Sequence, residues 1–160
     1  MDPSILPWRL IRRVVLYARR YYFSIAKPTG VPMIALEGVT ISDLTNVLEG
    51  AHFEDGWELS YREQGEALNA RRPSGTAAVK DVKHLQQQEH VRVWKTEGGL
   101  ELHPHREVSP LSRRPDFHVR DIGLDKPEGV HRLKPVLEDA FGADAVTVSN
   151  MPSASAASGE

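Results

Sequence analysis

Hydrophobic residues recur every three to four positions in two segments of the chain, which is the spacing of an amphipathic helix. The first segment follows Thr40 and ends near Gly50, and the second follows Asp125 and ends at Gly142. Threonine and aspartate are favoured helix N-caps, and glycine commonly follows a helix C-terminus. The sequence therefore predicts two helices, with apolar stripes of Ile41, Leu44, Val47 and Leu48, and of Val130, Leu133, Val136, Leu137, Ala140 and Phe141.

Alternating apolar and polar residues predict strands around these helices. The clearest signal is a hairpin over 90–105 with its turn at 96–99. Successive strand residues point to opposite faces, so the hairpin's apolar and polar residues are expected on different faces. Pro104 removes a backbone donor, which predicts an edge or bulged strand there. The apolar set is Val91, Val93, Leu100 and Leu102, and the polar set includes His90, Arg92, Trp94, Glu101, His103 and His105.

Weaker signals complete the predicted order of elements. Short strands are expected near 33–36, 57–61, 67–71 and 145–148. The polar stretch 72–88 is expected to be a loop with some helix, and 107–124 an irregular connection. The order contains two strand–helix–strand units, which favours an α+β domain over 31–150, a ferredoxin-like antiparallel sheet with two packed helices. Residues 151–160 are small and polar, which predicts a disordered tail.

The N-terminal segment, residues 1–28, is expected to contain a basic amphipathic helix over 6–26. On a helical wheel its basic residues gather opposite a broad apolar stripe. The basic set is Arg9, Arg12, Arg13, Arg19 and Arg20, and the stripe contains Leu10, Ile11, Val14, Val15, Tyr17, Ala18, Tyr21, Tyr22 and Ile25.

Such a helix has several interpretations. Its stripe could enter a membrane interface or a partner's groove, with the arginines facing lipid phosphates or an acidic surface. A homo-oligomer formed through the stripe is a further interpretation. Alternatively, the stripe packs on the domain's own sheet and the arginines are solvated. Tyr21 and Tyr22 favour an interface, because amphipathic aromatic side chains are stable at a wet boundary.

Composition narrows the functional classes. The chain has 160 residues and no cysteine, which excludes disulfides and cysteine metal ligands and favours a cytoplasmic location, peripheral to a membrane if the helix binds one. Arginines interrupt the N-terminal apolar run, so neither a membrane span nor a secretory signal is expected.

Charge divides the chain into two parts. Up to residue 36 the balance is +5, whereas the remainder carries 14 basic and 21 acidic groups, a balance of −7. Arg113, Arg114, Arg120 and His118 gather in one loop, which raises nucleic acid as a ligand. The acidic body argues against it, because phosphate-binding domains normally carry net positive charge.

The histidines of the hairpin are the sharpest chemical feature. His90, His103 and His105 share its polar face, and neighbouring imidazoles can hold a divalent metal. His118 or His131 could add a ligand, and a site with an open position could activate water. Arg92 would repel a metal, so a packing surface or solvated side chains are alternatives.

Established catalytic motifs for nucleotides, phosphate loops, serine hydrolases and zinc proteases are missing from the sequence. Two hypotheses follow. The first is a non-enzymatic cytoplasmic interaction module, without a cofactor, that the basic helix tethers to a membrane or a protein partner. The second is a small metal-dependent enzyme that uses the histidine cluster.

One stretch of the chain resembles the LssY carboxy-terminal domain family. It is the run Leu85-Gln-Gln-Gln-Glu-His90-Val-Arg-Val-Trp94. Gly56-Trp57 precedes this run, and a predicted turn, strand and capped helix follow it. The resemblance covers roughly residues 40–148. It implies a domain appended to membrane-associated proteins and assigns no chemistry, and no functional residue is carried over from it.

Overall fold

The computed structural model describes residues 27–55 and 65–152. The predicted N-terminal helix, the predicted strand at 57–61 and most of the predicted tail lie outside these ranges. Within them, no helix is long and apolar enough to cross a membrane.

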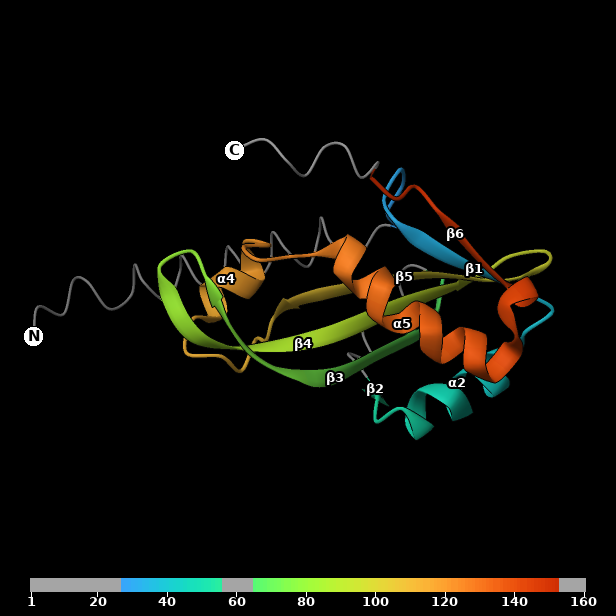
Figure 1. Ribbon diagram of the computed structural model, residues 1–160, viewed down its shortest axis with the longest axis horizontal. Helices are drawn as coiled ribbons and strands as arrows, with labels where there is room; N and C mark the ends of the chain where they lie inside the picture. Colours follow the sequence, from blue (N-terminus) through green and yellow to red (C-terminus); the bar gives the residue numbers. More distant parts are fainter. Residues whose placement is uncertain (1–26, 56–64, 153–160) are drawn as a thin grey trace, which may run out of the picture.

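The described residues form an α+β fold around one antiparallel sheet, with the strand order β2-β3-β4-β5-β1-β6 (Figure 1). The predicted α+β class and the predicted antiparallel sheet are confirmed. The strands are β1 (Met33–Glu37), β2 (Glu54–Asp55), β3 (Glu66–Val79), β4 (Val82–Lys95), β5 (Gly99–Val108) and β6 (Val146–Ser149).

Both predicted helices are present, as α2 (Ile41–Gly50) and α5 (Lys126–Phe141). Each begins at its predicted cap. The Thr40 hydroxyl accepts a hydrogen bond from the Asp43 backbone at 3.2 Å, and the Asp125 carboxylate accepts one from the Glu128 backbone at 2.9 Å. These bonds satisfy backbone donors that the first helical turn leaves unpaired. A short helix, α4 (Pro115–Val119), lies in the connection before α5.

The Asp125 cap makes a testable contribution to stability. We expect Asp125→Ala to lower the free energy of unfolding by about 1 kcal/mol, the usual cost of losing an N-cap. Asp125→Asn keeps a side-chain acceptor and serves as the matched control. Urea unfolding measures both. An equal loss in the two variants would contradict a capping role, since the second retains the bond.

The helices α2 and α5 cover one face of the sheet, here called the inner face, and α5 lies across β4 and β5 (Figure 1). The core between them supplies the main hydrophobic stabilisation. It contains Ile34, Leu36, Leu44, Leu48, Phe53, Leu68, Ala70, Val91, Val93, Leu100, Leu102, Val130, Leu133, Leu137 and Val146.

The opposite face, here called the outer face, carries the polar residues of the hairpin. Val93 pairs with Leu102 on the inner face, whereas Arg92 pairs with His103 and His90 with His105. The predicted separation of apolar and polar residues is therefore confirmed. The register of β4 against β5 determines which side chains meet on the outer face.

Pro104 lies where its missing donor is tolerated. The Arg106 backbone N–H points away from β4 and donates to the Asp125 carbonyl at 2.8 Å. Alternate residues of a strand direct their N–H groups the same way, so the Pro104 nitrogen also faces away from β4. Strand β1 pairs with β5 only over Gly99 to Leu102, so Pro104 lies on a part of this edge that β1 does not reach.

Two predictions of irregular structure are wrong in part. Residues 72–88 were expected to be a loop with some helix, but they complete β3 and β4, which pair as one long hairpin. The strands were missed because their side chains are polar and show no apolar–polar alternation. Several of these side chains bind one another across strands instead. Glu89, for example, accepts from the Arg72 Nε at 2.8 Å. The connection predicted at 107–124 begins with the last residues of β5 and contains α4.

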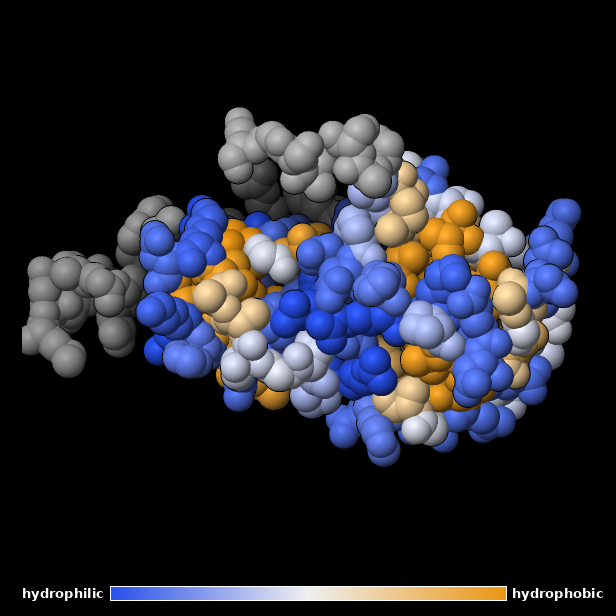
Figure 2. Space-filling model, viewed as in Figure 1, coloured by the Kyte–Doolittle hydropathy of each residue, from blue (hydrophilic) through white to orange (hydrophobic). Residues whose placement is uncertain are grey.

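The surface around α5 shows no continuous hydrophobic patch. Hydrophilic side chains cover most of its centre, and hydrophobic ones reach the surface in separate areas (Figure 2). Among the described residues, Leu111 and Met151 are the exposed large hydrophobic side chains. Isolated exposed side chains of this kind are ordinary and do not indicate a binding face.

Candidate metal centre

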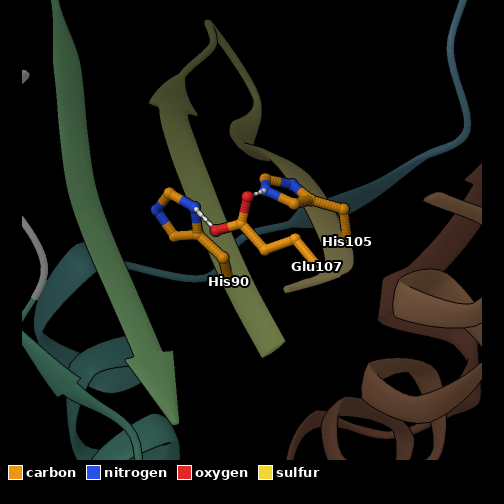
Figure 3. Close-up of side chains that lie close together, drawn as sticks. All are labelled: His90, His105 and Glu107. Carbon is orange, nitrogen blue, oxygen red and sulfur yellow. Dashed lines mark ion pairs between the residues drawn. The ribbon is translucent and has the colours of Figure 1, made fainter. Parts of the chain in front are cut away.

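A buried carboxylate is the centre of the polar cluster on the outer face. Glu107 is only 2% exposed. His90 from β4 and His105 from β5 point at it from two sides (Figure 3). His118 from α4 and Gln88 from β4 also contact it.

The pairing of β4 with β5 brings these residues together. His90 lies directly opposite His105, and Gln88 lies opposite Glu107. The two positions on each strand are two residues apart, so all four side chains point to the same face. The connection after β5 then returns His118 to the end of that strand.

The hydrogen bonds of His90 decide which ring nitrogen carries its proton. Asn69 donates through Nδ2 to Glu66 at 3.3 Å, so its Oδ1 is the atom that faces His90 Nε2, at 2.8 Å. Since Oδ1 only accepts, Nε2 is the donor. The other ring nitrogen, Nδ1, lies 3.4 Å from Glu107 Oε1 and is the atom that a metal would bind in place of a proton.

His105 has the same arrangement with its nitrogens exchanged. Its Nδ1 lies 3.4 Å from the backbone carbonyl oxygen of His103, which can only accept. Its Nε2 faces Glu107 Oε2 at 3.7 Å. Two imidazole nitrogens thus converge on one carboxylate.

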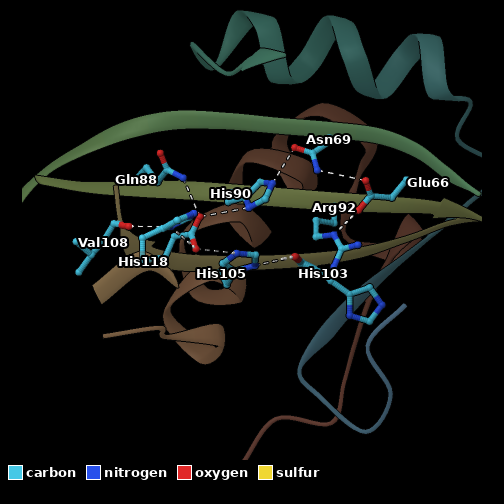
Figure 4. Close-up of polar contacts among 10 residues, drawn as sticks. Glu66, Asn69, Gln88, His90, Arg92, His103, His105, Val108 and His118 are labelled. Carbon is cyan, nitrogen blue, oxygen red and sulfur yellow. Dashed lines mark hydrogen bonds and ion pairs between the residues drawn. The ribbon is translucent and has the colours of Figure 1, made fainter. Parts of the chain in front are cut away.

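Donors on other sides hold this carboxylate in place. Gln88 Nε2 donates to Oε1 at 2.7 Å, and His118 Nδ1 lies 3.2 Å from Oε2 and 3.0 Å from the Val108 carbonyl oxygen. Figure 4 shows these contacts continuing to Asn69, Glu66 and Arg92. A carboxylate that is fixed in this way resembles a metal ligand supported by outer contacts.

Burial lowers the pKa of His90 below its ordinary value of 6.5 and outweighs the nearby Glu107, which raises it. Burial alone would raise the pKa of Glu107, but hydrogen bonds from His105, His118 and His90 hold that pKa well below 4.5. At neutral pH we therefore expect a neutral His90 beside an ionised Glu107.

The separations suit ligands of one divalent ion. His90, His105 and Glu107 each offer a ligand atom, and these atoms lie within 4.8 Å of one another. Two atoms that are each about 2.1 Å from a zinc ion lie about 3.4 Å apart at the tetrahedral angle. The separations from Glu107 to the two rings, 3.4 and 3.7 Å, are close to this value. The ligand atoms spread over as much as 4.8 Å, so the two rings must approach one another to close the site.

His103, the third predicted ligand, lies apart from this group. Its Nε2 lies 2.7 Å from Glu101 Oε1, and its ring packs edge-on against Trp94. Burial lowers the pKa of His103 and outweighs Glu101, which raises it. His131, the other candidate, is exposed on α5, which packs on the inner face.

Arg92 was expected to repel a metal bound at the hairpin histidines. In the structure its Nε donates to Glu66, and its guanidinium lies 4.8 Å from the centre of the Trp94 ring. Glu66 therefore offsets part of the Arg92 charge, although Arg92 still contributes to the lowered pKa of His90.

Glu107 and Gln88 were not among the predicted site residues. The predicted hairpin ended at 105, one pleat repeat before Glu107, and Gln88 lay in the predicted loop. Residues 101, 103, 105 and 107 alternate as Glu, His, His and Glu, and extending the strand by two residues would have placed Glu107 on the histidine face.

The arginines of the predicted nucleic-acid loop make contacts within the chain. Arg114 pairs with Asp116 through two hydrogen bonds of 2.8 Å and lies over the Phe117 ring. Arg113 donates to the Lys83 carbonyl. The Asp116 carboxylate therefore offsets part of the Arg114 charge, and a backbone oxygen binds the Arg113 guanidinium. The predicted membrane or partner residues, Arg9, Arg12, Arg13, Arg19, Arg20, Tyr21 and Tyr22, lie outside the described residues.

No protein-family model, curated protein or solved structure matches the chain. The resemblance to the LssY carboxy-terminal domain family therefore stays a prediction from the residues alone.

Proposed function

We propose that this chain is a divalent-metal protein whose centre consists of His90, His105 and Glu107, with zinc as the fitting ion. The observation that carries the proposal is the convergence of two imidazole nitrogens on one buried, ionised carboxylate. A divalent ion would take the place of the protons that the two rings share with Glu107 and would bind all three groups. Two histidines and one carboxylate are a common ligand set for zinc.

The outer contacts support the same proposal. Histidines that bind metals almost always donate their second ring nitrogen to an acceptor, which fixes the ring orientation. Asn69 Oδ1 and the His103 carbonyl are the acceptors here. Three protein ligands leave one tetrahedral position for water, as in catalytic rather than structural zinc sites. Water activation at this position is the chemistry that the metal would supply.

Zinc stoichiometry tests the proposal. For protein purified without a histidine tag and dialysed against zinc, we expect one ion per chain by mass spectrometry. His90→Ala and Glu107→Gln each remove a ligand and should abolish stoichiometric binding. Asn69→Ala removes an outer contact and should weaken binding by about 10- to 100-fold.

Two other histidines supply matched controls. His131→Ala changes an exposed residue on the inner-face helix, and His103→Ala changes the predicted ligand that lies apart. Both should retain one zinc per chain. A wild-type protein that binds no zinc, or equal binding by Glu107→Gln and wild type, would refute the proposal.

We also propose a ferredoxin-like topology for the sheet. The order β6-β1-β5-β4, with a helix after β1 and another before β6, supports it. Strands β2 and β3 then extend the β4 edge as an insertion. The tethering hypothesis rests on residues 6–26 and stays a prediction, as does a cytoplasmic location.

A further inference from the structure

The inner face carries a row of charged residues beyond the hydrophobic core. Arg72 of β3 lies directly opposite Glu89 of β4, and Glu89 lies directly opposite Arg106 of β5. Directly opposed side chains project from the same face, with Cβ atoms about 5 Å apart. Arg132 reaches this row from α5, where its Nη1 lies 3.3 Å from Glu89 Oε1. Three arginines from three elements therefore lie around one carboxylate.

Two of these arginines are held by carboxylates. Arg72 donates through Nε to Glu89 Oε2 at 2.8 Å, and its Nη2 lies 2.7 Å from the same oxygen. Arg132 donates through Nε to Glu128 Oε1 at 2.6 Å, in addition to its contact with Glu89. Arginine stays charged at physiological pH, so this group has three positive charges for the two carboxylates.

Arg106 is the arginine that these carboxylates do not bind. Its Nε is buried and has no hydrogen-bond partner among the described residues, although Glu89 lies directly opposite. A buried donor of a charged group that binds nothing is costly. The spare guanidinium can therefore bind an additional acceptor.

The start of α5 adds to the positive potential. Two backbone hydrogen bonds, of 2.8 and 2.7 Å, join Arg106 to Asp125, so Arg106 lies beside the first turn of the helix. A helix N-terminus disfavours a nearby cation and favours an anion. Arg132 is the main group that lowers the pKa of Glu128 in this turn, and Arg106 also contributes. Strongly hydrophilic residues gather beside this half of α5 (Figure 2).

Solvent reaches these arginines, and a phosphate group matches them. The side chains of Arg72 and Arg132 are 23% and 38% exposed. A phosphate group carries nearly two negative charges at neutral pH and offers three acceptor oxygens, so it can bind two guanidiniums at once. A carboxylate brings one charge and two oxygens, which suits this pair of arginines less well.

We propose that Arg106 and Arg132 bind the phosphate group of a small soluble molecule on the inner face. Glu89 and Glu128 orient Arg132 for this contact, and the ligand offsets the charge of Arg106. The net negative charge of the chain beyond residue 36 disfavours a long nucleic acid as the source of the phosphate. This site lies on the opposite face of the sheet from the proposed metal centre and does not depend on it.

NMR of the full chain with inorganic phosphate as the probe tests the inference. Proton–nitrogen spectra resolve arginine Nε–H groups, and the Arg106 signal is identified by its loss in Arg106→Gln. We expect the Arg106 and Arg132 signals to shift with phosphate until they saturate, with a dissociation constant of about 1 mM or lower. Sodium chloride at the same ionic strength should leave both signals in place.

Arg106→Gln should weaken phosphate binding at least tenfold, since it removes charge-assisted hydrogen bonds. Arg71→Gln is the matched control, because it removes the same charge from the outer face, where Arg71 lies opposite His90. This control should bind phosphate like wild type. Equal weakening in the two variants would overturn the inference, because it would show a general effect of net charge.

The unsubstituted chain keeps the inference testable even if Arg106→Gln fails to fold. If no arginine Nε–H signal shifts to saturation with phosphate, the inference is wrong. A short DNA duplex and phosphatidylcholine–phosphatidylserine vesicles are the other probes. Shifts with either of them, but not with inorganic phosphate, would also overturn the inference, because the ligand would then be a nucleic acid or a membrane.

Discussion

Zinc should raise the melting temperature of the protein by about 5–10 °C when its free concentration is 100 times the dissociation constant. Binding to the folded state alone stabilises it by about 2.7 kcal/mol at that ratio. For a chain of this size each kcal/mol corresponds to about 2–4 °C. The increase arises because the ion binds the folded arrangement of Glu107 and two imidazoles, which the unfolded chain lacks. Differential scanning fluorimetry with and without zinc, after removal of metals by EDTA, measures it.

Glu107→Gln should lose nearly all of this increase, because the neutral amide replaces the only charged ligand of the three. Its metal-free melting temperature is the reference for its own shift, so a change in intrinsic stability does not confuse the result. His131→Ala should show the full increase. The same rise in all three proteins would indicate zinc binding elsewhere, and the centre described here would be wrong.

Gly129→Ala should destabilise the protein by about 3 kcal/mol, although alanine normally favours a helix over glycine. Gly129 lies in the first turns of α5, where an added Cβ would overlap the backbone of Pro104 and His105. That backbone is paired with β4 and cannot rotate away as a side chain can. The helix must shift, which is the costly response of a close-packed interior to added volume. Chemical unfolding measures the loss.

Gly50→Ala is the matched control, because Gly50 also lies in a helix but its added Cβ meets no atom within 4 Å. We expect no destabilisation there. Equal stability of the two variants would show that α5 does not approach β5 as closely as described. Since His105 lies at the contact, Gly129→Ala should also weaken zinc binding.

The hairpin and the helix caps were predictable because their signals are local. Val91, Val93, Leu100 and Leu102 alternate without interruption, and the cap residues Thr40 and Asp125 act within three positions of their own place in the sequence. Such patterns depend on backbone geometry alone, so tertiary context did not alter them.

The long β3–β4 hairpin and Glu107 were not predictable for the opposite reason. Polar residues such as Glu89 and Gln88 occupy strand positions because their partners, Arg72, Arg132 and Glu107, come from other elements. Strand propensity reflects packing against neighbours more than the sequence of one segment. A polar run whose partners lie far away in the sequence therefore looks like a loop.

Side chains of β5 alternate strictly between the two faces of the sheet, so the site depends on the number of residues in this strand as well as on their type. Deleting or inserting one residue between Leu102 and Glu107 would exchange the faces of everything beyond that point. His105 and Glu107 would then turn toward α5, and Arg106 would be among the side chains that replace them on the outer face. Homologues that keep this centre should accordingly vary in the turn at 96–98 or after 109, and conserve the spacing of the strand between.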